Sequence, residues 1–237
     1  FSTEPLKDTV RQVVPHGWVD HRNLWLMVCD IDTGERVALG RAGAPECDLA
    51  DAVAASCAIP GFYHPVVIGG RCYVDGGCWS TSNLDVLDGQ RLDMVICLNP
   101  TSSLERSERW QDQIGNAYRS ASGRLLGHEA RQLRRQGTRV VLLQPSIDAL
   151  RVMGNNLMRS GDLDAITEVA LASVTLQLRT PEYSDCVKTL RRLARSAEVA
   201  PRRRISRAAA RVVRGVGRAM QSPVGARTVA AGVSKPE

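Results

Sequence analysis

The chain alternates short apolar runs with longer segments in which apolar residues recur at helical spacing. Residues 24–29 form a continuous apolar run, which is typical of a strand buried on both faces, and residues 36–39 resume a strand pattern after a turn at residues 32–35. Residues 65–68 and 71–74 flank a Gly-Gly pair, an arrangement that predicts a β-hairpin. Further strands are expected at residues 92–98 and 139–143.

Helices are predicted between these strands. The small apolar residues that follow Asp48 indicate a helix that Pro60 and Gly61 bring to an end. Residues 104–136 have a helical composition, and residues 162–178 place apolar side chains at helical spacing. Buried strands that alternate with helices predict an α/β fold, with helices covering a largely parallel sheet.

Composition narrows the classes of protein to consider. Hydrophobic residues make up 43% of the chain, enough for a sizeable core, whereas aromatic residues make up only 4%, which argues against a base-stacking platform for nucleic acid. No apolar run approaches the roughly 18 residues needed to span a bilayer. The seven cysteines are an odd number and contain no C-x-x-C pair, so reduced thiols are expected. These features predict a cytoplasmic protein that is at most membrane-peripheral.

Positive charge is concentrated at the end of the sequence. Residues 188–237 hold 13 Lys and Arg against 2 Asp and Glu, a net charge of +11, which leaves −5 for residues 1–187. Two basic stretches of helical pattern, residues 188–195 and 204–214, lie on either side of Pro201. Three interpretations stay open: a solvated helical tail, a peripheral contact with anionic lipid headgroups, or contact with RNA or DNA.

Residues 49–100 carry the most specific pattern in the sequence. Its parts are, in order, residues 55–62 (Ala-Ser-Cys-Ala-Ile-Pro-Gly-Phe), Pro65 and Val66, residues 73–77 (Tyr-Val-Asp-Gly-Gly), Asn83 and the apolar run 92–98. An Asp-Gly-Gly box by itself is usually a turn. The combination at these spacings is specific.

This order resembles the second half of the patatin fold. There, a helix ends in a small-Ser-x-Ala-x-Pro turn and is followed by a short hairpin and an Asp-Gly-Gly or Asp-Gly-Ala box. The resemblance covers roughly residues 22–180 and implies a three-layer α/β/α sandwich with a mainly parallel sheet. We expect residues 1–180 to be the C-terminal portion of a patatin-like domain whose N-terminal part is missing, and residues 181–237 to be a basic helical tail.

The resemblance also implies a catalytic role for Asp75. In patatin-like lipid acyl hydrolases a serine attacks the acyl carbonyl, and one aspartate, without histidine, serves as its general base. Asp75 matches that aspartate and ends an apolar strand, and Gly76 and Gly77 leave room for close backbone approach and permit a φ above zero. The alternative is that Asp75 caps a turn by accepting hydrogen bonds from amides that follow it.

Three further residues match structural positions of the family. Ser56 and Pro60 match the turn that ends the helix, and Asn83 matches an asparagine that is expected to pin the loop after the Asp-Gly-Gly box. The family usually has a proline soon after that asparagine, where this chain has Leu84 and Asp85.

The sequence does not contain the nucleophile that the resemblance requires. No serine lies in a Gly-x-Ser-x-Gly context, and Ser120 and Ser122 come closest but lie in a predicted helix. A glycine-rich loop that could bind an oxyanion is also missing, because Gly69 and Gly70 belong to the hairpin turn. We therefore expect both elements in an N-terminal part that precedes these 237 residues.

Other chemical groups are weaker candidates. No metal or organic cofactor is implied, and the four histidines lack metal-ligand spacing: His16, His21, His64 and His128. Asp30 and Asp32 could form a carboxylate pair, but turn chemistry around Gly34 accounts for Asp32.

The predicted function is hydrolysis of lipid or phospholipid acyl esters by a Ser-Asp dyad, of which this chain supplies Asp75. The alternative is an inactive lipid-binding or scaffolding protein whose basic tail contacts an anionic membrane or nucleic acid. Nucleic acid is the less favoured partner because aromatic residues are few.

Overall fold

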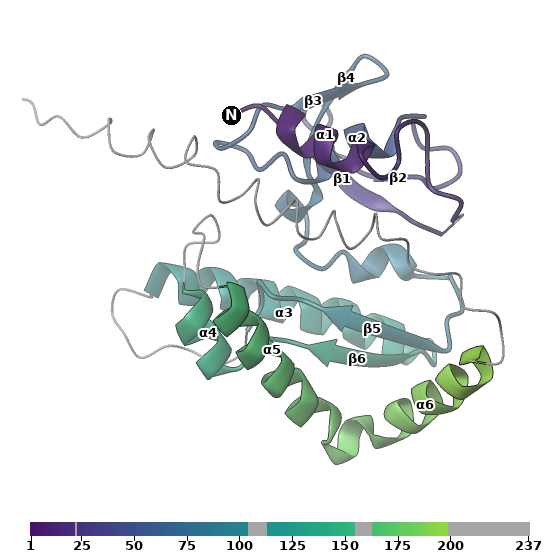
Figure 1. Cartoon of the computed structure of the whole chain (residues 1–237), viewed down its shortest axis with the longest axis vertical. Helices are drawn as coiled ribbons and strands as arrows, with labels where there is room; N and C mark the ends of the chain where they lie inside the picture. Colours follow the sequence, from purple (N-terminus) through teal and green to yellow (C-terminus); the bar gives the residue numbers. More distant parts are fainter. Residues whose placement is uncertain (22, 104–112, 155–162, 199–237) are drawn as a thin grey trace, which may run out of the picture. The chain divides into compact units, whose positions relative to one another are not determined.

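The computed structural model describes residues 1–21, 23–103, 113–154 and 163–198 (Figure 1). Within these ranges the chain forms two compact units, one up to Cys78 and one from Trp79 onward. Each unit has a hydrophobic core of its own.

The first unit contains a four-stranded antiparallel sheet with strand order β2-β1-β4-β3. Its strands are β1 (Leu26–Asp30), β2 (Arg36–Leu39), β3 (Val66–Ile68) and β4 (Arg71–Asp75). β1 pairs with β2 in a register that places Leu26 opposite Leu39, and with β4 in a register that places Val28 opposite Asp75. β1 and β4 are thus the two inner strands of the sheet.

The predicted hairpin is confirmed as β3 and β4. Ile68 lies opposite Arg71, so the connection consists of Gly69 and Gly70 alone. Their φ angles are +57° and +79°, the left-handed region that a two-residue type I′ turn requires at both positions. The Gly-Gly pair therefore sets the register of the strand that ends at Asp75.

Two helices pack together in the first unit, α1 (Glu4–Arg11) and α2 (Leu49–Ser56). The predicted helix after Asp48 is confirmed as α2, although it ends at Ser56, before Pro60. Its small residues fit closely against the sheet, and the core contains Ala52, Ala54 and Ala55 together with Val28, Leu39 and Tyr73. The sequence pattern did not predict α1, because this helix is mostly polar and buries only Thr9.

The second unit contains a two-stranded parallel sheet, β5 (Met94–Leu98) and β6 (Arg139–Leu143). Its longer helices are α3 (Gln113–Arg135), α5 (Leu163–Leu178) and α6 (Ser184–Glu198). Its shorter elements are the helix α4 (Ile147–Met153) and the 3₁₀ turns η2 (Leu84–Leu87) and η4 (Pro181–Tyr183). The chain passes from β5 to β6 through a connection that includes α3, as parallel pairing requires.

Helices cover both faces of this parallel pair (Figure 1). On one face Val95, Cys97 and Val140 pack against α3. On the other face Val141 and Leu143 pack against residues of α5, η4 and α6, namely Val174, Leu178, Tyr183 and Cys186. Three layers, α/β/α, are therefore present in the second unit.

The prediction of a mainly parallel sheet does not hold for the first unit. Every strand pairing there is antiparallel. The connections between β1 and β2 (residues 31–35) and between β3 and β4 (two glycines) are too short for a parallel crossover, whereas no such limit applies to β1 and β4. The apolar run 24–29 leads into β1, an inner strand of this antiparallel sheet. A continuous apolar run is typical of any buried strand, so it did not show whether the neighbouring strands are parallel or antiparallel.

The helix predicted over the first basic stretch, residues 188–195, is present as part of α6. The second basic stretch, residues 204–214, lies outside the described residues. The domain division at residues 180 and 181 stays a prediction.

Candidate functional site

Asp75 is the last residue of β4. Its backbone is held on two sides, since β4 pairs there with Val28 of β1 and the Asp75 amide donates a hydrogen bond of 3.1 Å to the carbonyl of Ala58. Ala58 lies in the turn after α2, so the turn predicted from Ser56 and Pro60 lies beside the backbone of the predicted base.

The Asp75 carboxylate is half-buried and has one hydrogen-bond partner in the part of the chain that the structure describes. Its Oδ1 accepts a hydrogen bond of 2.7 Å from the amide of Gly77. Burial raises the pKa of the Asp75 carboxyl above its ordinary value, and the hydrogen bond from Gly77 offsets part of that rise. The described residues offer no hydrogen-bond donor to Oδ2. The bond to Gly77 matches the turn-capping alternative, yet it occupies only one of the two carboxylate oxygens.

The two glycines after Asp75 differ in what surrounds them. A Cβ atom at Gly76 would lie 2.6 Å from the backbone carbonyl atoms of Met27, so only glycine fits against β1 at this position. A Cβ atom at Gly77 would lie 3.0 Å from Asp75 Oδ1. The positive φ that the sequence analysis also considered is adopted by neither glycine.

The charge of Asp75 affects the pKa of two exposed cysteines, Cys57 and Cys78. Burial and the nearby charge of Asp75 raise the pKa of the Cys57 thiol. Burial, Cys29 and Asp75, in that order, raise the pKa of the Cys78 thiol. A raised pKa keeps a thiol protonated and weakens it as a nucleophile. No disulfide joins any of the seven cysteines, all of which lie in the described ranges.

Asn83 lies in a tight loop of the second unit, residues 80–83. Its φ is +51°. The Asn83 side-chain amide donates a hydrogen bond to the Ser80 backbone carbonyl, and the Asn83 backbone amide donates to the Ser80 hydroxyl at 3.0 Å. The Ser80 hydroxyl in turn donates to Glu129 Oε1 at 2.6 Å. These hydrogen bonds join Asn83 to Ser80 within the loop, and the match of Asn83 to the family's asparagine stays a prediction.

Glu129 is a buried carboxylate that the sequence analysis did not identify. It is 3% exposed, and its Oε2 accepts the Leu84 amide at 3.1 Å. A proline in place of Leu84 would have no amide hydrogen for this bond, which gives a physical reason for a non-proline residue at this position. Glu129 lies 45 positions after Leu84, and no local pattern in the sequence marks such a pair.

The serines that came closest to a nucleophile are buried in α3. Ser120 and Ser122 are each less than a tenth exposed, and the Ser122 hydroxyl contacts that of Thr81. Such an environment does not present a hydroxyl to a substrate.

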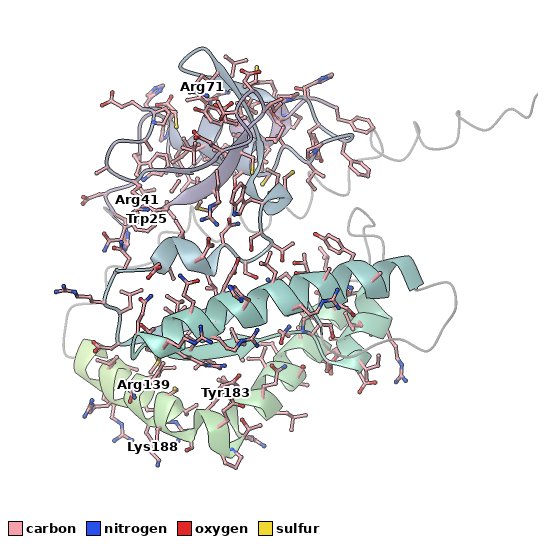
Figure 2. All side chains as sticks on the ribbon, turned by 180° about the vertical axis from the view of Figure 1, so that it is seen from behind. Trp25, Arg41, Arg71, Arg139, Tyr183 and Lys188 are labelled. Atoms are coloured by element: carbon pink, nitrogen blue, oxygen red, sulfur yellow. The ribbon has the colours of Figure 1, made fainter. Side chains whose placement is uncertain are left out.

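Asp30 and Asp32 do not form a catalytic pair. Asp30 is 2% exposed, and its carboxylate pairs with Arg71 Nε at 2.5 Å and accepts from the amides of Asp32 and Thr33 at 2.9 and 3.2 Å. Burial alone would raise the pKa of Asp30, but Arg71 and these amides together hold it below its ordinary value. Figure 2 labels Arg71 on the hairpin. The pair joins β4 to the end of β1.

A hollow of about 350 Å³ lies in the second unit and contains none of the predicted site residues. It is lined by Arg91, Leu92, Asp93, Gln136, Gly137 and Arg139. The four histidines are exposed, and the described residues contain no group of three or more His, Cys, Asp or Glu side chains placed to hold a metal ion.

Within the described ranges, no helix combines the length and the apolar character that crossing a bilayer demands.

None of the curated proteins matches the chain. A family model described as patatin-like phospholipase matches residues 1–88. The matched range begins earlier than the residues 22–180 expected from the resemblance, and it ends earlier, at residue 88. It includes the predicted site residues Ser56, Pro60, Asp75, Gly76, Gly77 and Asn83. The resemblance to patatin-like phospholipases is thereby confirmed for residues 1–88.

Proposed function

We propose that this chain belongs to a lipid acyl-ester hydrolase and supplies Asp75 as its general base. The observation that carries the proposal is the state of the carboxylate: Oδ1 is fixed by the Gly77 amide, and Oδ2 has no donor among the described residues. A base must be held in place and must have an oxygen available for the incoming proton. The match of residues 1–88 to patatin-like phospholipases supports the same role.

In the proposed reaction a serine hydroxyl attacks the acyl carbonyl while its proton passes to Asp75. The proton then goes to the departing alcohol, which leaves an acyl-serine. In the second half Asp75 takes a proton from water, hydroxide attacks the acyl carbonyl, and the proton returns to the serine oxygen as the fatty acid leaves. The serine is assigned to polypeptide outside these 237 residues, because no Gly-x-Ser-x-Gly occurs within them. No cofactor takes part in the scheme.

The test uses the chain together with any in-frame sequence upstream of the Phe1 codon. We expect hydrolysis of short-chain p-nitrophenyl esters, and we expect Asp75→Asn to lower kcat/KM by about 10²–10⁴-fold, the range for loss of a general base. Asp32→Asn is the matched control, since it removes an exposed carboxylate from the same unit. Full activity in the Asp75→Asn protein would show that the base has been assigned wrongly.

A second candidate is an inactive lipid-binding or scaffolding protein. The observation that favours it is the missing nucleophile: the serines nearest to the expected pattern, Ser120 and Ser122, are buried. The reading frame upstream of the Phe1 codon separates the two candidates. An in-frame Gly-x-Ser-x-Gly there supports the hydrolase, whereas a start codon close to Phe1 supports the inactive protein.

A further inference from the structure

Helix α6 is fixed to the second unit through its first half. Cys186 is buried with Val141 and Leu143 of β6, and Arg139 Nη1 donates to the Thr189 hydroxyl at 3.3 Å. Tyr183, just before the helix, donates from its hydroxyl to the Leu142 carbonyl at 3.2 Å. Figure 2 labels Arg139, Tyr183 and Lys188 in this region. The helix therefore has a defined orientation on its unit.

The side chains of α6 separate into two stripes. At 100° per residue, Cys186, Val187, Leu190, Leu193 and Ala194 share one side of the helix, and Lys188, Arg191, Arg192 and Arg195 share the opposite side. The four cationic side chains are all exposed.

Burial of the apolar stripe decreases along the helix. Cys186 is buried, Val187 and Leu190 are half-buried, and Leu193 is 57% exposed. The end of the apolar stripe thus projects beyond the part of the helix that packs on β6. An exposed leucine between exposed arginines is costly in water and is suited to a boundary between water and an apolar phase.

Positive charge surrounds this exposed end. Arg191 and Arg195 have no ion pair among the described residues, and Arg139 adds a further cation near the start of the helix. Lys188 pairs with Asp185 at 2.9 Å, and Lys188 together with Arg139 holds the pKa of Asp185 below its ordinary value. The charge complements a surface of anionic groups.

We infer that the C-terminal half of α6 is a docking surface for an anionic phospholipid membrane. Leu193 enters the boundary between headgroups and acyl chains, while the arginines of α6 contact phosphate and carboxylate groups. Nucleic acid fits less well, since it would use the cations but leave Leu193 in water, and α6 has no aromatic side chain for stacking. The inference rests on the proposed function in that a lipid hydrolase must meet its substrate at a lipid surface.

The test is sedimentation of the full chain with vesicles of phosphatidylcholine alone, or with vesicles in which about a third of the lipid is phosphatidylserine. We expect binding to the anionic vesicles only. Arg191→Glu with Arg195→Glu should weaken it by roughly tenfold or more, and Leu193→Ser by about tenfold. Arg191→Lys with Arg195→Lys should retain binding, because the charge is kept. The matched control is Arg124→Glu with Arg131→Glu, which makes the same charge change at exposed positions of α3.

The inference is overturned if Arg191→Glu with Arg195→Glu, or Leu193→Ser, sediments like the unmodified chain. It is also overturned if the α3 control loses as much binding. A third contrary outcome is that added single-stranded RNA releases the protein from vesicles at a lower concentration than added anionic lipid does. The readout does not depend on hydrolysis. Asp75→Asn should bind vesicles normally, so loss of the docking surface and failure of the proposed chemistry give different results.

Discussion

Two features of its surroundings act on the Asp75 carboxylate: one holds it in place, and the other makes it more basic. The hydrogen bond from the Gly77 amide at 2.7 Å fixes Oδ1, while partial burial makes the charged form less stable and so makes the carboxylate a stronger base. A fully exposed aspartate would have neither property. Asp30, with both oxygens engaged and its pKa lowered, shows the opposite arrangement in the same unit and is suited to a structural ion pair.

The raised pKa of Asp75 predicts a pH-dependent cost to stability. The folded protein holds this proton more tightly than the unfolded chain, so the free energy of unfolding falls as pH rises from the unfolded-state pKa through the raised folded-state pKa. Asp75→Asn cannot ionise and escapes this cost. We expect the variant to unfold at higher urea concentration than the unmodified chain at about pH 7, with the difference shrinking toward about pH 3, where both forms are neutral. Asp32→Asn, at an exposed position, is the control. If Asp75→Asn raises the free energy of unfolding equally at both pH values, the raised pKa of Asp75 is not the cause of the gain.

Single residues differ in how far the sequence could specify them. Asp75 and Asn83 could be proposed as candidates because neighbours in the sequence surround them with a recognisable pattern. The contact that makes Gly76 necessary was not visible, because Met27 lies on another strand and becomes a neighbour only through β1–β4 pairing. The same holds for Glu129, which accepts hydrogen bonds from Leu84 and Ser80, 45 and 49 positions earlier.

Among the elements, local signals were sufficient where a turn has a strict backbone requirement. The hairpin β3–β4 followed from two adjacent glycines, and α2 followed from a run of small residues. The direction of pairing between distant strands carries no such signal. β1 pairs with β4 across more than 40 residues, and the apolar run at β1 is equally compatible with parallel neighbours.

The junction between β4 and the 3₁₀ turn η1 (Gly76–Cys78) allows stability and catalysis to be separated. Gly76→Ala would place a Cβ atom 2.6 Å from the Met27 backbone, and we expect a loss of about 1–3 kcal/mol in the free energy of unfolding. Gly77→Ala meets only the Asp75 carboxylate, at 3.0 Å. It should therefore affect stability less and esterase activity more, by displacing Oδ1.

Urea unfolding and p-nitrophenyl ester hydrolysis, measured on both variants, check this separation. Gly127→Ala in α3 is the control, because its Cβ atom would meet only Arg131 at an ordinary 3.6 Å and should add about 0.5–1 kcal/mol of helix stability. Equal stability losses at Gly76 and Gly77 would show that β1 yields to the added methyl group.

At the scale of the whole molecule, the family match and the compact units have different boundaries. The match includes all the described residues of the first unit and continues through residue 88, beyond the unit boundary at Cys78 and past the end of η2. The patatin-like segment thus contains the antiparallel sheet with Asp75 and the start of the second unit, including the loop that Glu129 holds. The α/β/α layers around β5 and β6 lie after it.

The two units should respond separately to damage in their cores, because the cores share no residue. Leu39 is fully buried in the core of the first unit, and Leu126 is buried beneath β5 and β6 in the second. Leu39→Ala and Leu126→Ala each remove a buried side chain and should each cost about 2–5 kcal/mol locally. Hydrogen exchange read by mass spectrometry distinguishes the sites, since exchange rates rise where local opening becomes easier. We expect Leu39→Ala to speed exchange in peptides from β1, β2 and α2, and Leu126→Ala to speed it in peptides from α3 and β6, with the other unit unchanged in each case. If both variants instead speed exchange in both sets equally, the chain opens as one cooperative body, and a substitution in the second unit would then also weaken the support of Asp75.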